Sequence, residues 1–234
     1  MWSLLCGLSW GFAPVSLSAG TAAVAVPAYF SGHQDSVRLT NGDMLAIGPG
    51  DGPLATSRVE GRVALGSRWS LGLGLCSWSH LTAHSVSSVE LGPPRSETPI
   101  GQARSTLVYF GPRIALQVRG LWLLPWLGCY ASVAAGRPVW GRLTLEGGGL
   151  DGQASGWLRT GLAMDGAVGA RLQRHAWGLE LGATAAWLEA ASSPSVNGAV
   201  NDDGIAARMA SEVSLGPPGP GLELTVIWTP WEAR

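Results

Sequence analysis

Side chains that could carry out hydrolysis gather between residues 79 and 90. His80 and His84 are accompanied there by several serines and by Glu90, and a serine nucleophile needs a nearby base and an orienting acid. The segment is rich in serine throughout, however, and it lacks the Gly-x-Ser-x-Gly turn that exposes a nucleophile. We therefore predict no catalytic residues and interpret this segment as a solvated loop.

Two further segments resemble ligand sites in composition only. Residues 201–204 are acidic but lack the spacing of a calcium loop, which favours a turn. Residues 48–52 are glycine-rich but have no lysine and no strand-to-helix context, so they are no phosphate loop. Cys6, Cys76 and Cys129 have no metal-ligand spacing. Cys76 and Cys129 are either a disulfide of an oxidising compartment or small core residues. We expect no metal and no cofactor.

The composition favours a membrane protein built from strands. Charged residues make up 13% of the 234 residues, about half the usual share, and all 15 basic residues are arginines. The net charge of −1 gives no reason to expect a nucleic-acid partner. Residues 121–136 are uncharged, but this stretch is short for a membrane helix and contains Pro125. A barrel hides hydrophobicity by alternation over about 10 residues per strand.

The clearest strand pattern runs from Trp177 to Trp187, where alternate residues are apolar. Ten residues at about 3.3 Å each, tilted by about 40°, span roughly 25 Å, the height of the apolar band of a membrane barrel. Similar alternation occurs in residues 58–65, 69–76, 108–116, 158–172 and 222–228. An aromatic girdle at the membrane interface is predicted to contain Trp69, Trp177, Trp187 and Trp228.

The connections between these segments are predicted to alternate in length. Short turns are expected near residues 66–67, 117–120 and 173–175, and long loops near 33–56, 81–103, 136–155 and 191–203. This alternation is typical of an all-β, up-and-down antiparallel transmembrane β-barrel. Eight strands are favoured, starting near residues 22–32, with one of the segments 205–215 and 221–231 assigned to the last loop. Ten strands are the alternative if the N-terminus supplies another.

Residues 1–20 are interpreted as a signal peptide, and residues 21–234 as a single β-barrel domain. The first 34 residues contain no Asp, Glu or Arg, and small residues follow an apolar stretch near residues 17–19. The usual basic start of a leader is missing, so a strand-forming N-terminus is the alternative.

Charged residues of the strands fall on the face opposite the apolar one. Since buried charges must be paired to be tolerated, we expect a lumen filled by an ion-pair network. The predicted members are six arginines and five acids: Arg58, Arg62, Arg113, Arg159, Arg171 and Arg208, with Glu60, Asp165, Glu180, Glu212 and Glu223. The alternative for these residues is the lining of a selective pore.

The pattern resembles the small outer-membrane β-barrel proteins of Gram-negative bacteria, including the transmembrane domain of outer-membrane protein A. The ending is similar to the C-terminal assembly signal of that class: Leu222, Leu224, Val226 and Trp228 alternate with Glu223, Thr225 and Ile227. Residues 229–234 follow the terminal aromatic and depart from that signal. The resemblance implies a location in the bacterial outer membrane, with membrane lipid and the barrel-assembly machinery as partners.

These observations predict a non-enzymatic, porin-like outer-membrane barrel with a structural or small-pore role. One alternative is a soluble or secreted β-barrel that binds an apolar ligand inside; its interior would be apolar and its exterior polar. The other is an outer-membrane lipid-modifying hydrolase, which would use the histidines near residues 80–84.

Overall fold

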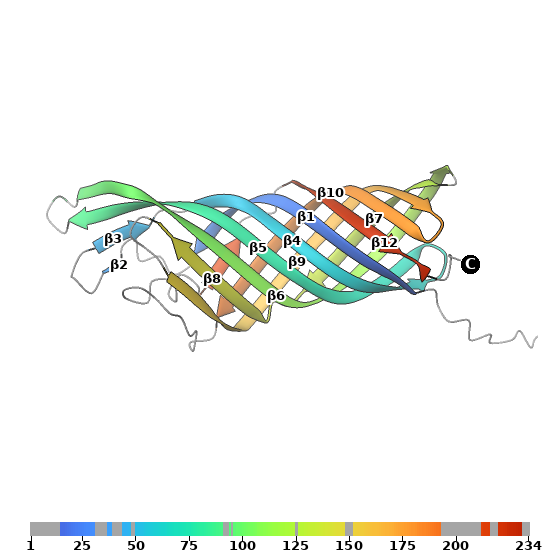
Figure 1. The fold of residues 1–234 in the computed structure, drawn as a ribbon, viewed down its shortest axis with the longest axis horizontal. Helices are drawn as coiled ribbons and strands as arrows, with labels where there is room; N and C mark the ends of the chain where they lie inside the picture. The colour runs from blue at the N-terminus through green and yellow to red at the C-terminus, as the bar shows by residue number, and fades with distance from the viewer. Residues whose placement is uncertain are drawn as a thin grey trace, which may run out of the picture.

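The chain folds into an all-β barrel whose neighbouring strands run antiparallel (Figure 1). The computed structural model describes residues 15–30, 37–38, 44–47, 50–90, 94, 96–124, 126–147, 152–192, 212–215 and 220–230. The strands in these residues are β1 (Val15–Phe30), β2 (Val37–Arg38), β3 (Met44–Ile47), β4 (Gly50–Leu65), β5 (Trp69–Glu90), β6 (Ser96–Leu124), β7 (Leu127–Gly136), β8 (Trp140–Glu146), β9 (Gly152–Arg174), β10 (Trp177–Ser192), β11 (Glu212–Leu215) and β12 (Gly221–Trp228).

The barrel wall has eight strand positions. Strands β7 and β8 both pair with β6 and β9, so they are two pieces of one position. Strands β11 and β12 both pair with β1 and β10 and form another. The ring therefore runs β1, β4, β5, β6, β7/β8, β9, β10, β11/β12 and back to β1. The predicted count of eight is confirmed. The assignment of one C-terminal segment to a loop is wrong, because β11 and β12 both pair with β1 and β10 and so both belong to the wall.

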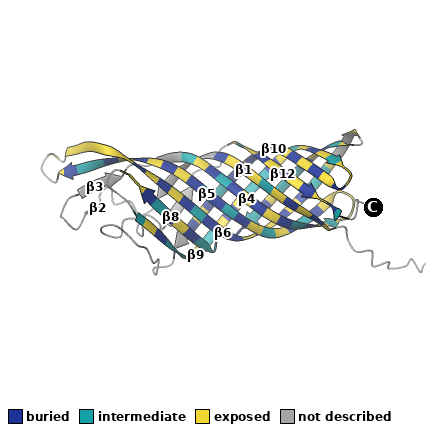
Figure 2. Ribbon diagram, in the orientation of Figure 1, coloured by how far each residue is buried: buried dark blue, intermediate teal, exposed yellow. Residues whose placement is uncertain are grey.

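Side chains alternate between the two faces of the wall, which gives the checkerboard in Figure 2. On β10, Trp177, Leu179 and Leu181 are exposed, whereas Gly178 and Glu180 are buried. Exposed large hydrophobic side chains occur at every one of the eight positions. Soluble proteins rarely expose so much contiguous apolar surface, so this outer face suits lipid. It is the opposite of the polar exterior that a soluble ligand-binding barrel requires.

Three strands extend far beyond the length needed to cross a membrane. Strand β5 has 22 residues, β6 has 29 and β9 has 23, against about 10 for a crossing. The long loops predicted near 81–103 and 136–155 are therefore largely strands. Their inward residues include polar ones such as His84 and Ser105, both buried. Burial still alternates through this part of β5, where Leu81 and Ala83 are exposed and Thr82 and His84 are buried, and the pairing with β6 continues.

The short turns lie at one end of the barrel, together with the end of β12 (Figure 1). Gly66 and His175 occupy them with φ angles of 80° and 52°, a backbone region that favours glycine. The turn predicted near residues 117–120 is wrong. Strand β6 continues through it to Leu124, because its pairing with β7 extends as far as Leu124 and Leu127.

The predicted boundary at residue 20 does not match the first strand. Strand β1 begins at Val15, and residues 15–20 pair with both β4 and β12. These residues belong to the barrel wall because their alternation continues that of residues 21–24. Residues 1–14, which hold the rest of the predicted leader, lie outside the described part of the chain.

Candidate functional site: the filled barrel interior

The interior near the short turns is occupied by paired charges, which we name the ion-pair layer. In the described residues its ion pairs join four arginines to four acids. The members are Arg58, Glu60, Arg62, Arg113, Asp165, Arg171, Glu180 and Glu223. Their side chains are at most 5% exposed, except that of Asp165 at 11%. Such burial is tolerable only with pairing and good geometry.

Glu180 is the central acceptor of this layer. Its carboxylate accepts hydrogen bonds from Arg62 at 3.2 Å and from Arg171 at 3.1 Å. The amide of Gln117 donates a third at 2.8 Å. These donors come from β4, β9 and β6, which do not pair with one another. One carboxylate on β10 therefore links three separate parts of the wall.

Two further groups complete the layer. The Arg113 guanidinium forms a fork with Asp165, at 3.1 and 2.5 Å, and also contacts Glu60. Arg58 donates to Glu223 at 2.9 Å, and the Tyr130 hydroxyl donates to the same carboxylate at 2.8 Å. Bidentate arginine–carboxylate pairs are directional as well as strong, so they fix the side chains across the lumen.

Beyond the ion-pair layer, toward the long strand extensions, the interior becomes hydrophobic. We name this cluster the apolar layer; its buried members are Val24, Leu54, Cys76, Trp78, Leu107, Tyr109, Leu143, Ala163, Ala186, Leu188 and Ala190. Glycines make room for its two largest rings. A Cβ added at Gly136 would lie 2.5 Å from the Trp78 indole, and one at Gly141 would lie 2.5 Å from the Tyr109 ring. The lumen is therefore filled by side chains at two successive levels, as expected of a barrel this narrow.

Not every predicted member of the network lies in the ion-pair layer. Arg159 is exposed, because the pairing register between β9 and β10 shifts there: Ala191 pairs with Thr160 and Ser192 pairs with Leu158. Arg159 is thus the extra residue of a β-bulge, which reverses the parity of the residues before it. Assigning Arg159 to the lumen was wrong. Arg208 lies outside the described residues, and for Glu212 the structure describes the backbone of β11 only.

The histidines proposed for hydrolysis are buried within the strand extensions instead of lying in a solvated loop. His84 Nε2 is 2.8 Å from Ser105 Oγ, and His80 Nδ1 is 2.5 Å from Thr82 Oγ1. His84 and Ser105 are each 1% exposed, so a substrate would not reach this pair. The interpretation of this segment as a solvated loop was wrong, and its histidines serve the interior packing.

The two cysteines of the barrel wall form no disulfide. Cys76 points into the apolar layer, whereas Cys129 is exposed on the outer face. Of the two predicted alternatives, Cys76 fits the small core residue. Within the described residues, no group of three or more His, Cys, Asp or Glu side chains could hold a metal ion.

The predicted girdle residues occupy the two edges of the exposed apolar band. Trp69, Trp177 and Trp228 are exposed near the short turns, and the rings of Trp177 and Trp228 are 6.4 Å apart. Trp187 is half-buried ten residues further along β10. An aromatic group near that far edge was not predicted: it consists of Phe110 and Trp140, whose rings are 5.8 Å apart, and the exposed Trp157.

Neutral members of the interior were not predicted either. Gln117 and Tyr130 bind carboxylates of the ion-pair layer. Strand alternation could have identified Gln117, because it has the same parity on β6 as the inward Arg113. It could likewise have identified Tyr109 and Leu188 of the apolar layer, which share the parity of Arg113 and Glu180. The signal that could have identified them is the alternation itself: every second residue along a strand from a charged inward residue also points inward.

Comparison with known proteins adds structural neighbours but no sequence relatives. No protein-family model matches the sequence, and no curated protein matches it. The fold is similar to Neisserial surface protein A, with a TM-score of 0.44, 9% identity, and coverage of 92% of this chain and 97% of that one. It is also similar to the outer membrane protein OprG from Pseudomonas aeruginosa, with a TM-score of 0.35 and 10% identity over 92% of this chain and 95% of that one.

Ail, the attachment invasion locus protein of Yersinia pestis, is a third neighbour, with a TM-score of 0.33, 10% identity, and coverage of 92% of this chain and 96% of that one. The structural neighbours are small outer-membrane β-barrels. In the described part of the chain, no helix has the length and hydrophobicity to cross a membrane.

Proposed function

We infer that this protein is a non-enzymatic outer-membrane β-barrel with a structural role, whose interior is closed to ions. The observation that carries this proposal is the filling of the lumen at two levels. Paired charges occupy the level near the short turns, and the apolar layer around Trp78 occupies the next. An ion crossing the barrel would have to break buried pairs and then pass a dry apolar constriction.

Membrane lipid and the barrel-assembly machinery are the partners that suit this role. The outer face offers lipid an apolar surface at every strand position. Strand β12 ends in Trp228 after strict alternation of exposed and buried residues, the pattern that resembles an assembly signal. The short turns then face the periplasm, and the long extensions of β5 and β6 project outside the cell.

Fractionation tests the location. The protein should be recovered in the outer-membrane fraction, should require detergent for extraction and should migrate differently on a gel before and after heating. Recovery as a soluble periplasmic monomer would overturn the proposal.

Planar-bilayer recording tests whether the lumen is closed. The wild-type protein should add no steady conductance to the bilayer. As a positive control, Trp78→Ala combined with Glu180→Ala removes filling at both levels and should introduce a leak. Large and steady conductance of the wild-type protein would instead establish the small-pore role.

A further inference from the structure

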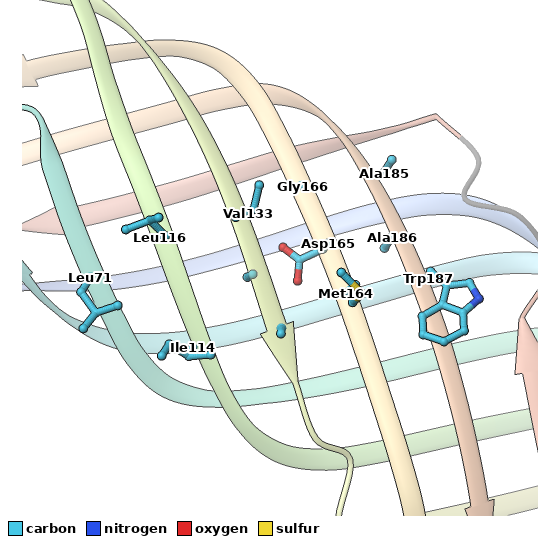
Figure 3. Close-up of a pocket in the computed structure, with 12 residues that line it drawn as sticks. Leu71, Ile114, Leu116, Val133, Met164, Asp165, Gly166, Ala185, Ala186 and Trp187 are labelled. Carbon is cyan, nitrogen blue, oxygen red and sulfur yellow. The ribbon is translucent and has the colours of Figure 1, made fainter.

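The outer face carries a hollow on the wall formed by β5, β6, β7, β9 and β10, with a volume of about 660 Å³ (Figure 3). Gly166 lies at its centre, paired with Val133 on one side and Ala185 on the other. The larger side chains of Met164 and Trp187 lie in the next row and border it. The hollow exists because small residues stand in one row of an otherwise bulky apolar surface.

Packing does not require the glycine at the centre of this hollow. A Cβ added at Gly166 would meet only the carbonyl oxygen of Ser132, at an ordinary 3.5 Å. A larger side chain would therefore fit and fill the space. The lining is almost entirely apolar and is continuous with the exposed apolar band, so the group that suits the hollow is an acyl chain of a membrane lipid.

Exposed arginines stand beside the hollow, on the side away from the short turns. Arg137 is two residues beyond Ala135, which lines the hollow. Arg159 lies on the strand beside Arg137, because the backbone N–H of its neighbour Leu158 donates to the carbonyl of Val139 at 2.9 Å. The bulge that removes Arg159 from the lumen is what turns it to this outer face.

The charge balance of this rim is positive among the described residues. Arg142, on β8, is exposed as well and donates to Gln153. An exposed carboxylate, Glu189, lies in the same region, because it pairs with Leu162, three residues from Arg159 on β9. Glu146, four residues beyond Arg142 on β8, is exposed on the same face and offsets it, so Arg137 and Arg159 outnumber Glu189 here. Arginine is well suited to binding phosphate oxygens.

We propose that this surface binds a phosphorylated membrane lipid, with an acyl chain in the hollow beside Gly166 and the phosphate at Arg137 and Arg159. The proposal goes beyond a structural role for the barrel, because it assigns one wall a preferred lipid. It depends on these side chains pointing outward from the barrel, and it does not depend on whether the lumen conducts ions.

Native mass spectrometry of the refolded protein in detergent tests the site. Dioleoyl phosphatidic acid and dioleoyl phosphatidylcholine are the probes, since they share acyl chains and differ in the headgroup. The wild-type protein should bind one molecule of phosphatidic acid in preference to phosphatidylcholine. Arg137→Ala and Arg159→Ala should each lower that preference about fivefold, the effect of roughly one interfacial charge. Arg174→Ala, at the opposite end of β9, should leave it unchanged.

A second pair of variants tests the hollow. Gly166→Leu should weaken the binding of both lipids, whereas Ala170→Leu, an outward position on the same strand, should not. Folding of each variant is checked by its gel shift on heating. Equal binding of both lipids to the wild-type protein, or the same loss in Arg174→Ala as in Arg137→Ala, would overturn the proposal. The assay is carried out in detergent, so it tests neither the cellular location nor the conductance of the protein. A failure of lipid binding is therefore distinguishable from a failure of the proposed function.

Discussion

Replacing Glu180 with alanine should strongly destabilise the barrel. Glu180 is fully buried and accepts from Arg62, Arg171 and Gln117. After the substitution Arg62 keeps Glu60 at 3.3 Å as a carboxylate partner. Among the described contacts, Arg171 keeps only the neutral amide oxygen of Gln173. The change therefore leaves one buried guanidinium without its counter-charge.

The size of the effect follows from that single unpaired charge. Removing one partner of a buried ion pair costs about 3–5 kcal/mol, because the remaining charge keeps its desolvation penalty. With a denaturant dependence of about 2 kcal/mol per molar urea, the unfolding midpoint should fall by about 2 M. Glu180→Gln should show a smaller loss, because the amide still accepts a hydrogen bond.

The assay is urea unfolding of the protein refolded into lipid vesicles, followed by tryptophan emission. Glu189→Ala is the matched control, since Glu189 lies on the same strand and is exposed. The double variant Glu180→Ala/Arg171→Ala removes both charges and should be less destabilised than the two single effects added together.

Two results would refute this reasoning. One is a midpoint for Glu180→Ala equal to that of Glu189→Ala, which would mean that the interior is hydrated enough to screen the lost charge. The other is strict additivity in the double variant, which would mean that Glu180 and Arg171 do not stabilise one another.

Three further changes test the wall, the apolar layer and the first strand. Leu181→Arg places a charge on the exposed outer face and should cost roughly 2–4 kcal/mol in vesicles; insertion as efficient as wild type would show that this face does not meet lipid. Trp78→Ala leaves a cavity in the apolar layer and should cost about 3–5 kcal/mol in the same urea assay, whereas an unchanged midpoint would mean that the layer collapses around the gap. A truncation that removes residues 1–20 should refold poorly, because residues 15–20 pair with β4 and β12, whereas removal of residues 1–14 should be tolerated. Equal yields of heat-modifiable protein from both truncations would contradict the placement of β1.

Much of the wall could be predicted because strand alternation is a local property. The parity of Trp177, Leu179 and Leu181 against Glu180 follows from the backbone of a strand, and the structure preserves it. The same rule failed at Arg159, where a bulge inserts one residue. A bulge depends on how two strands pair, so the sequence of one strand does not show where it occurs.

The sequence alone determined that the strands have one apolar face and one face that carries the charges. Such strands can cross a membrane only as a closed barrel, because only closure satisfies every strand edge there. Tertiary structure decided which charges meet. Glu180 contacts Arg62, which is 118 residues away in the chain, and Arg58 contacts Glu223 across a separation of 165. Such partners are set by strand register and barrel diameter, which arise only when all eight strand positions close.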